Sequence, residues 1–302
     1  MKFNLPARKP FNFLSVVNSH GWRQLAPFSY DENTLTLSYI LRLSNGRVLE
    51  LKFQDGTDGI TVETEKLNKI ERREVMEKVT WMLGLDMDFS LFYAASRGEP
   101  KLARVKKRAL GRVLRSPTLF EDVIKTILTT NTLWAATKNM TLKLVNEFGA
   151  STAGREEIDP PLSAMPNRKA FPTPEAIAGS TPEFIREKIR VGYRAPAIHE
   201  LAVRVASGQF DLESLKTGNL PTLELRKELL TINGVGPYAA ANLLMILGRH
   251  DFIPIDSSAL TVVSHEWYGG KPVTAKEIEK RFEKWGKFKG IAFWFWDWEY
   301  DG

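Results

Sequence analysis

The chain has 302 residues, 43% of them hydrophobic, enough for two domains or one large domain with a sizeable core. It contains no cysteine, which excludes disulfides, thiolate zinc sites and cysteine-ligated iron–sulfur clusters, and its four histidines lack metal-ligand spacing. The net charge of +6 suits a polyanionic partner, although a solvated basic surface would give the same excess. No apolar run reaches the length of a membrane span, and the first residues do not form a signal peptide. We therefore expect a monomer in the cytoplasm or nucleoid, or in the nucleus of a eukaryote, with no membrane partner and no bound metal.

Residues 1 to about 65 are typical of an antiparallel sheet with one solvent-facing side. Residues 34–43 alternate between apolar and polar side chains, residues 48–53 alternate again, and Asn45-Gly46 between them predicts a hairpin turn. Residues 65–83 are helix-periodic, and Gly84 is placed to cap that helix. The sequence predicts a first domain over residues 1–90, made of this sheet and one helix.

From residue 91 the pattern is helical almost throughout, which makes the whole chain α+β with an all-α second domain over residues 91–302. Helices are expected at 119–131, from the Thr129–Thr132 break to 149, at 182–192, at 196–208, and from the capping box Thr274/Glu277 to 286. Residues 151–171 are polar and proline-rich and predict a surface loop. The basic run comprises Lys101, Arg104, Lys106, Lys107, Arg108, Arg112 and Arg115; such a run is usually a solvated face, but this one could follow phosphates.

Residues 222–248 predict two helices joined by a tight glycine turn. A charged amphipathic helix ends at Asn233, Gly234-Val235-Gly236 turns the chain, and Pro237 opens a second, almost wholly apolar helix. The N–H groups of Val235, Gly236 and Tyr238 should then point outward at a helix N-terminus, which is a binding site for an anion such as phosphate.

The same glycines also fit a dinucleotide-binding fingerprint. Gly234, Gly236 and Ala239 match G-x-G-x-x-A, and Asp256 follows Gly236 by 20 residues. That fingerprint requires a buried strand before the first glycine, whereas residues 225–230 are charged and helix-periodic. This alternative is therefore disfavoured.

The pattern resembles the helix-hairpin-helix DNA glycosylase superfamily, over nearly the whole chain. The hairpin G-V-G-P-Y-A is followed by Asp256, 18 residues after Tyr238, at the family's spacing for a catalytic aspartate. The most similar branch is that of 8-oxoguanine glycosylase and bacterial alkyladenine glycosylase, which carry an N-terminal antiparallel sheet. Further segments that resemble the 8-oxoguanine enzyme are Leu83–Asp86, Thr129–Asn131, Phe171-Pro172 and Gly192–Ala195.

The resemblance implies a role for several residues. Asp256 would be the catalytic carboxylate, Tyr193 the side chain that wedges into the duplex, and Asn131 and Arg194 the contacts to the base opposite the lesion. Phe293 and Asp297, together with Tyr238, would line the pocket for the extruded base. The partner would be double-stranded DNA containing a damaged or mismatched base. The resemblance implies no required cofactor. A monovalent cation bound by the hairpin carbonyls is an alternative that the sequence does not decide.

Two positions depart from the 8-oxoguanine pattern. Tyr238 stands where bifunctional members carry a nucleophilic lysine, and a phenol cannot form a Schiff base, so we expect hydrolysis without strand cleavage. Tyrosine at this position also resembles mismatch thymine and uracil glycosylases. Ala136 replaces a basic residue that helps read the opposite base, which puts a preference for cytosine in doubt.

Each proposed role has a structural alternative. Asp256 precedes Ser257-Ser258-Ala259 and could cap a helix, a role compatible with catalysis. Tyr193 could be a packed helix-end aromatic, Asn131 a helix cap, and the aromatic cluster at 293–298 part of the core. We expect a monofunctional glycosylase for an alkylated or oxidised purine, or for uracil or thymine opposite guanine. The alternative is a helix-hairpin-helix protein that binds DNA lesions without catalysis.

Overall fold

The structure is a computed structural model that describes residues 1–151 and 168–299. Its N-terminal part is an antiparallel sheet in the order β1-β5-β4-β3-β2. The strands are β1 (Lys2–Pro6), β2 (Phe28–Asp31), β3 (Thr36–Arg42), β4 (Val48–Asp55) and β5 (Gly59–Glu63). The predicted turn at Asn45-Gly46 is confirmed, since Gly46 has a φ of +86° and the Leu43 N–H donates to the Arg47 carbonyl at 2.8 Å. The predicted α+β class with an N-terminal antiparallel sheet is therefore correct.

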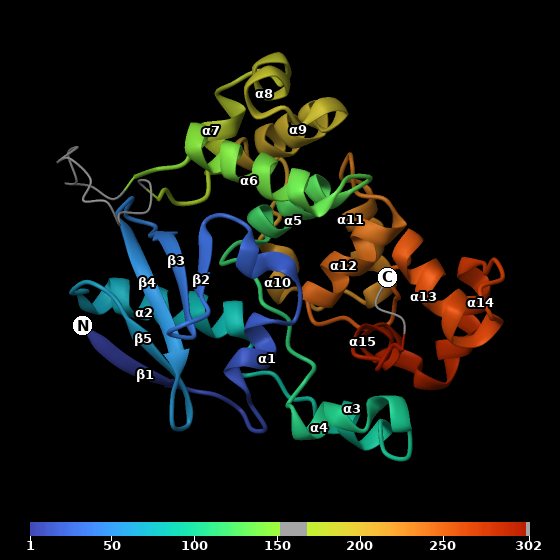
Figure 1. Ribbon diagram of the computed structural model, residues 1–302. Coiled ribbons are helices and arrows are strands. Elements are labelled where there is room, and N and C mark those ends of the chain that lie inside the picture. Colours follow the sequence, from blue (N-terminus) through green and yellow to red (C-terminus); the bar gives the residue numbers. More distant parts are fainter. Residues whose placement is uncertain (152–167, 300–302) are drawn as a thin grey trace.

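Two short elements interrupt the sheet domain, and the sequence prediction missed both. They are α1 (Phe13–Val17) and the 3-10 helix η1 (Gly21–Gln24), between β1 and β2. The long helix α2 (Lys69–Leu83) follows the last strand and crosses one side of the sheet (Figure 1). These insertions contact the helical part of the molecule: the Trp22 indole N–H donates to Asp122, and the Trp294 indole N–H donates to the Ser19 carbonyl.

The rest of the described chain is helical. Its first elements are α3 (Ser90–Ala95), η2 (Pro100–Leu102), α4 (Arg104–Lys107), α5 (Leu119–Thr129), α6 (Trp134–Phe148), α7 (Pro174–Ala178) and α8 (Pro182–Ile189). The next are η3 (Gly192–Arg194), α9 (Ala195–Ala206), α10 (Ser214–Thr217), α11 (Thr222–Leu230) and α12 (Pro237–Ile246). The last are α13 (Ser257–Tyr268), α14 (Ala275–Phe282), η4 (Glu283–Phe288) and α15 (Lys289–Trp294).

Most predicted helices are present, with ends that differ by a few residues for local reasons. Helix α2 begins at Lys69 rather than 65, because Asn68 and Glu71 form a capping box at that point. Helix α5 ends at Thr129, where the hydroxyls of Thr129 and Thr130 bond back to the carbonyls of residues 126 and 127. Helices α8 and α11 end at Ile189 and Leu230, short of the predicted 192 and 233. Residues 152–167 of the predicted loop lie outside the described residues.

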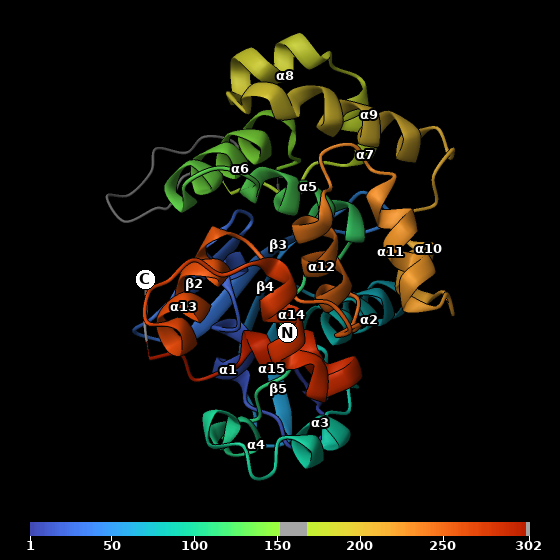
Figure 2. The ribbon, with the colours of Figure 1, turned by 90° about the vertical axis from the view of Figure 1, so that its right-hand side faces the viewer.

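Two large apolar cores hold the described elements together, beside a small third cluster of Ile40, Val48 and Ala170. The larger core joins the sheet, α2, α5, α6, α9, α11 and α12, and it includes side chains from both sides of residue 90. The smaller core joins α3, α4, α13, α14 and α15. Helix α5 lies at the centre, with every side chain from Leu119 to Leu128 buried, and Figures 1 and 2 show it between the sheet and α12. The space beside α5, where sheet domain and helices meet, is where the candidate site lies.

Candidate active site

Helices α11 and α12 form the predicted helix-hairpin-helix. Gly234 has a φ of +82°, a left-handed value that glycine adopts readily, and Gly236 caps α12 with an ordinary φ of −88°. Pro237 is the first helical residue, as predicted, so the N–H of Tyr238 in the first turn has no intrahelical partner. One expectation needs correction. The Val235 N–H does not point outward, because it donates to the Ile232 carbonyl at 3.0 Å.

A cavity of about 340 Å³ lies below this hairpin and contains Asp256 in its wall. We call it the Asp256 cavity. Residues of the sheet domain line one side: His20, Gly21 and Trp22. Residues of α5, α6 and the turn between them line another: Thr126, Thr129, Thr132, Trp134 and Thr137. The remaining lining residues are Tyr238, Asn242, Met245 and Ile246 of α12, with Asp256, Ser258 and Trp294. The volume and the aromatic lining suit a flat ligand of the size of a nucleobase.

Asp256 performs the capping role and still faces the cavity. It is the N-cap of α13, and one carboxylate oxygen, Oδ1, accepts from the Ala259 N–H at 2.8 Å. The residue is half-buried. The cap fixes the carboxylate at the positive end of a helix, and the second oxygen, Oδ2, is left for other partners.

Tyr238 shares the cavity with Asp256. Burial, and then the negative charge of Asp256, raise the pKa of the Tyr238 phenol. The phenol is therefore neutral at physiological pH and can act as a hydroxyl donor or acceptor, but it offers no amine for covalent chemistry.

The aromatic side chains around the cavity have their polar atoms already bonded to protein. The indole N–H of Trp22 donates to Asp122 at 2.7 Å, that of Trp134 to Gln24 at 3.0 Å, and that of Trp294 to the Ser19 carbonyl at 2.9 Å. The hydroxyls of Thr126, Thr129 and Thr137 likewise donate to backbone carbonyls. The tryptophans therefore present mainly apolar ring surface to a ligand. Asp256, Tyr238, Asn242, Thr132 and Ser258 supply the remaining polar groups.

His20 is held as a neutral ring. Its Nδ1 accepts from the Trp22 N–H at 3.1 Å, so its Nε2 carries the proton and donates to the Leu114 carbonyl at 2.7 Å. Burial, with a smaller effect of Lys125, lowers the pKa of His20 to about 4 against the opposing bond to Leu114. His20 therefore fixes the backbone of the cavity wall and contributes no charge near pH 7.

The structure brings the three predicted duplex-contacting residues together. The Asn131 amide donates to the Tyr193 hydroxyl at 3.3 Å, a bond that lowers the pKa of that phenol, and the Arg194 guanidinium lies 4.6 Å from the centre of the Tyr193 ring. Tyr193 is 64% exposed, as a side chain that enters a duplex must be. Asn131 has a φ of +46°, so its loop position is backbone-strained.

Arg194 itself is placed differently from what the resemblance implies. It is only 7% exposed, and its guanidinium donates to the carbonyls of Val191, Thr130 and Asn131. In this arrangement it braces the loop that carries Asn131 and offers no free edge to an opposite base. Arg194 is the last residue of the short η3 turn, and the carbonyls around its guanidinium hold the side chain inward.

The structure does not place Phe293 and Asp297 in the lining of the Asp256 cavity. Phe293 is buried in the smaller core, where its ring contacts Phe282 and Trp298 at centroid distances of 5.4 and 5.1 Å. Asp297 is exposed and forms an ion pair with Arg104 at 2.7 Å. The neighbouring Trp294 lines the cavity instead, because α15 presents that face to α1 and α12.

Several cavity residues were missed by sequence reasoning altogether. His20, Gly21 and Trp22 belong to an element that shows no helical periodicity, and no local motif distinguishes them. Asn242 could have been found, because it lies one helical turn after Tyr238 on the same face of α12. The basic run is also divided: Lys106, Lys107 and Arg108 are exposed, whereas Arg112 and Arg115 are buried.

Comparisons with solved structures concern the fold. The chain is 23% identical to a 3-methyladenine DNA glycosylase from Archaeoglobus fulgidus, with a TM-score of 0.71, and the match covers 98% of this chain and 97% of that one. It is 24% identical to MBOgg1, solved in complex with a low-affinity DNA ligand, with a TM-score of 0.70 over 94% and 90% of the chains. An 8-oxoguanine glycosylase/lyase from Clostridium acetobutylicum is 20% identical, with a TM-score of 0.67 over 92% of each chain. At these identities the likeness establishes the fold.

Other comparisons concern the sequence. No curated protein matches the chain significantly. Within the described ranges 1–151 and 168–299, no helix is long and apolar enough to cross a membrane, and no group of three or more acidic or histidine side chains is arranged to hold a metal.

A family model described as HhH-GPD superfamily base excision DNA repair protein matches residues 124–288, more than half of the chain. The match contains both hairpin helices and Asp256, and the chain belongs to the HhH-GPD superfamily of base excision DNA repair proteins.

Proposed function

We propose that this protein is a monofunctional DNA glycosylase that extrudes a damaged or mismatched base and hydrolyses its N-glycosidic bond. The observation that carries the proposal is the position of Asp256, in the wall of an aromatic-lined cavity directly after a helix-hairpin-helix. The structural neighbours named as glycosylases support this class of activity. A base inside a duplex is out of reach of such a cavity, so the nucleotide must be flipped out.

The cavity supplies the two requirements of hydrolysis. Cleavage of the N-glycosidic bond builds positive charge on the sugar, and a fixed carboxylate beside C1′ stabilises that charge and can take a proton from the attacking water. Asp256 is fixed by its bond from the Ala259 N–H, which leaves Oδ2 for this chemistry. The neutral phenol of Tyr238 cannot replace water as the nucleophile through an imine, and the reaction ends at an abasic site with the strand intact.

Among the candidate substrates, the lining favours alkylated purines. Alkylation at a ring nitrogen gives a purine a positive charge, and such a base is attracted by aromatic faces and by a carboxylate. Trp22, Trp134 and Trp294 present ring surface, and their N–H groups are already used. Oxidised purines and mismatched uracil or thymine rely more on specific hydrogen bonds, for which the cavity holds fewer free groups, and they remain the alternatives.

The DNA backbone and the opposite strand engage separate parts of the protein. The N–H groups of Gly236 and Tyr238 at the start of α12 would bind a phosphate of the lesion strand, and Tyr193 with Asn131 would fill the gap left by the extruded base. A monovalent cation on the hairpin carbonyls would share the Ile232 carbonyl with the Val235 N–H. We expect the protein to act as a monomer.

The experiment incubates the protein with duplexes that each carry one lesion, followed by alkali. Base release should appear as strand breakage only after alkali, and it should be lost in Asp256→Asn while DNA binding persists. Asn retains the capping oxygen, so this variant removes the charge and keeps the fold. A chain that binds lesions equally well but releases no base from any duplex would support the alternative, a lesion-binding protein without catalysis.

A further inference from the structure

One wall of the Asp256 cavity comes from the sheet domain and is held against helices α5 and α6. The segment His20–Trp22 lines the cavity, and Trp134 packs directly over Gly21, where an added Cβ would lie 2.2 Å from the indole. The indole N–H of Trp22 donates to Asp122 of α5 at 2.7 Å, and both side chains are buried. Asp122 itself does not line the cavity, and its carboxylate bonds to the cavity wall at Trp22.

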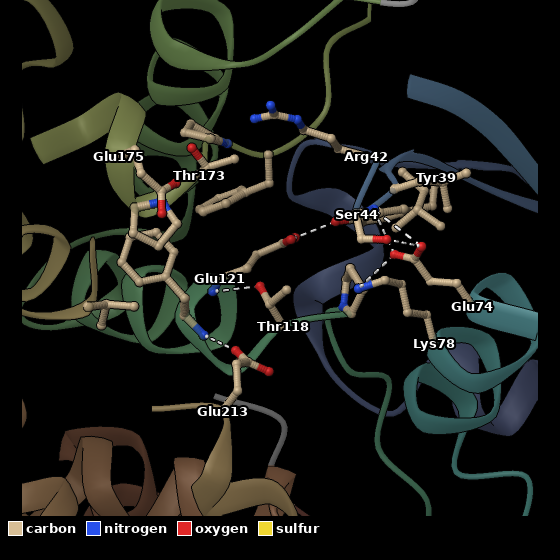
Figure 3. A pocket seen from close by; sticks show the side chains of 18 residues that line it. Tyr39, Arg42, Ser44, Glu74, Lys78, Thr118, Glu121, Thr173, Glu175 and Glu213 are labelled. Atoms are coloured by element: carbon tan, nitrogen blue, oxygen red, sulfur yellow. Dashed lines mark hydrogen bonds and ion pairs between the residues drawn. The ribbon is translucent and has the colours of Figure 1, made fainter. Parts of the chain in front are cut away.

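The preceding residue of α5 holds a different part of the sheet. The Tyr39 hydroxyl of β3 donates to Glu121 at 2.5 Å, and the same carboxylate accepts from Lys125 at 2.6 Å. Figure 3 shows Glu121 directed towards Tyr39 in a second cavity, of about 400 Å³, between β3, α2 and the start of α5. Glu121 and Asp122 therefore make two similar buried bonds to the sheet domain, of which only the second reaches the wall of the Asp256 cavity.

Within the described part of the chain, no cationic side chain bonds directly to Asp122. Its other hydrogen bonds come from the Ser116 N–H, at 3.0 and 3.2 Å, while Lys125 bonds to Glu121 and to the Ser116 hydroxyl. A buried carboxylate without an ion pair is costly, and burial raises the pKa of Asp122 to about 6 against the opposing bonds. An apolar side chain of similar volume would fill this place at no such cost, but it would not fix the orientation of an indole.

We propose that Asp122 is a positioning residue of the base cavity, which sets the place of Trp22 and thereby the fit of an extruded base. The proposal rests on the proposed function, because it assigns Trp22 a surface against the flipped base. Loss of the Asp122 acceptor frees the indole to rotate and leaves the base less well enclosed. The hairpin and the Tyr193 loop, which contact the rest of the DNA, are untouched.

The test uses duplexes with and without a base at the lesion. In an Asp256→Asn background, binding is measured to a duplex with one 7-methylguanine and to the same duplex with a tetrahydrofuran abasic site. Asp122→Leu should weaken binding to the first by about ten-fold, the order expected for one buried charge-assisted bond, and leave the second unchanged. Asp122→Asn keeps an acceptor for the indole and should restore most of the lost affinity. In the enzyme with Asp256 intact, Asp122→Leu should raise KM more than it lowers kcat.

Tyr39→Phe is the matched control, because it removes a comparable buried bond on the Glu121 side. It should lower thermal stability and leave both affinities unchanged. Where Asp122→Leu does not fold, Trp22→Phe breaks the same bond from the indole side. Equal loss of affinity for both duplexes, or equal effects of Tyr39→Phe and Asp122→Leu, would show a purely structural role and overturn the proposal. Failure of the proposed function would look different, since then the chain with Asp256 intact would release no base from any lesion duplex.

Discussion

Tyr238 and Asp256 face the same cavity, and the Asp256 carboxylate adds to burial in raising the pKa of the Tyr238 phenol. This pair decides between hydrolysis and covalent catalysis. We predict that borohydride will trap no protein–DNA complex with the native chain, because a phenol forms no imine. Tyr238→Lys places a primary amine beside Asp256 and should yield a trapped complex, visible as a shifted band on a denaturing gel. Tyr238→Gln, which is polar but not nucleophilic, is the control. A trapped complex with the native chain would contradict the monofunctional assignment.

The two hairpin glycines should respond differently to alanine. A Cβ at Gly234 would lie 3.3 Å from the Ala197 Cβ, at a φ of +82°, so Gly234→Ala should cost about 1–2 kcal/mol of stability. A Cβ at Gly236 would meet no atom within 4 Å, at an ordinary φ of −88°, so Gly236→Ala should leave the melting temperature unchanged. If the Gly236 N–H approaches a phosphate, the added methyl group should nevertheless weaken DNA binding several-fold. Unchanged affinity of Gly236→Ala for abasic and undamaged duplexes would show that the hairpin does not grip the backbone.

The sequence predicted those features that depend on local spacing. The hairpin, the cap at Asp256 and the Asn45-Gly46 turn follow from glycine, proline and aspartate at fixed offsets, and the structure contains all three. The grouping of Asn131 with Tyr193 was reached by resemblance only, because the two side chains are 62 residues apart in the chain.

What could not be predicted depends on tertiary packing. Phe293 and Trp294 are adjacent aromatics on a short helix, and which of them faces the cavity is decided by the helices packed around α15. The same holds for Trp22, whose role arises from a bond to a carboxylate 100 positions later in the chain. The buried direction of Arg194 is likewise set by the carbonyls that surround it.

Arg194 should matter for stability more than for the choice of opposite base. Its guanidinium satisfies the carbonyls of Val191, Thr130 and Asn131 in a buried setting, so Arg194→Met should destabilise the chain by about 2–4 kcal/mol. Chemical denaturation measures this cost. Relative cleavage of duplexes with each of the four opposite bases, at a temperature where the variant is folded, should keep the native order. A changed order with native stability would instead favour direct contact with the opposite base.

Tyr193 should show the reverse pattern. Because its side chain is 64% exposed, Tyr193→Ala should leave the melting temperature nearly unchanged while reducing single-turnover base release by ten-fold or more, if the ring fills the gap in the duplex. Tyr193→Phe removes the bond from Asn131 and keeps the ring, so it should retain most of the activity. Leu223→Ala, on an exposed side chain of α11, serves as the control for loss of surface area. Normal activity of Tyr193→Ala would exclude the wedge role.

The stability of the cavity wall should depend on the protonation of His20. Burial lowers the pKa of His20 to about 4, below the ordinary 6.5, so its neutral form stabilises the fold above pH 6.5. This contribution is lost as the pH falls from 6.5 through 4 and amounts to about 3 kcal/mol when complete. Protonation at Nδ1 would place a second donor against the Trp22 N–H, so the charged form of His20 would lose this bond.

The carboxyl of Asp122 has the opposite effect on stability. Its pKa is raised to about 6, so its protonation adds stability as the pH falls from 6 to 4.

The measurement is the free energy of unfolding between pH 7.5 and pH 4.5, for the native chain and for two variants. His20→Gln should lose stability at pH 7.5 and show a weaker loss on acidification than the native chain, because the group that must take up a proton on unfolding is gone. Asp122→Asn should show a steeper loss, because the opposing carboxyl is removed. His199→Gln, at a half-buried histidine outside the cavity, controls for generic effects of the substitution. Parallel pH curves for the native chain and His20→Gln would mean that His20 does not titrate with the fold, and the neutral tautomer assigned to the cavity wall would have to be abandoned.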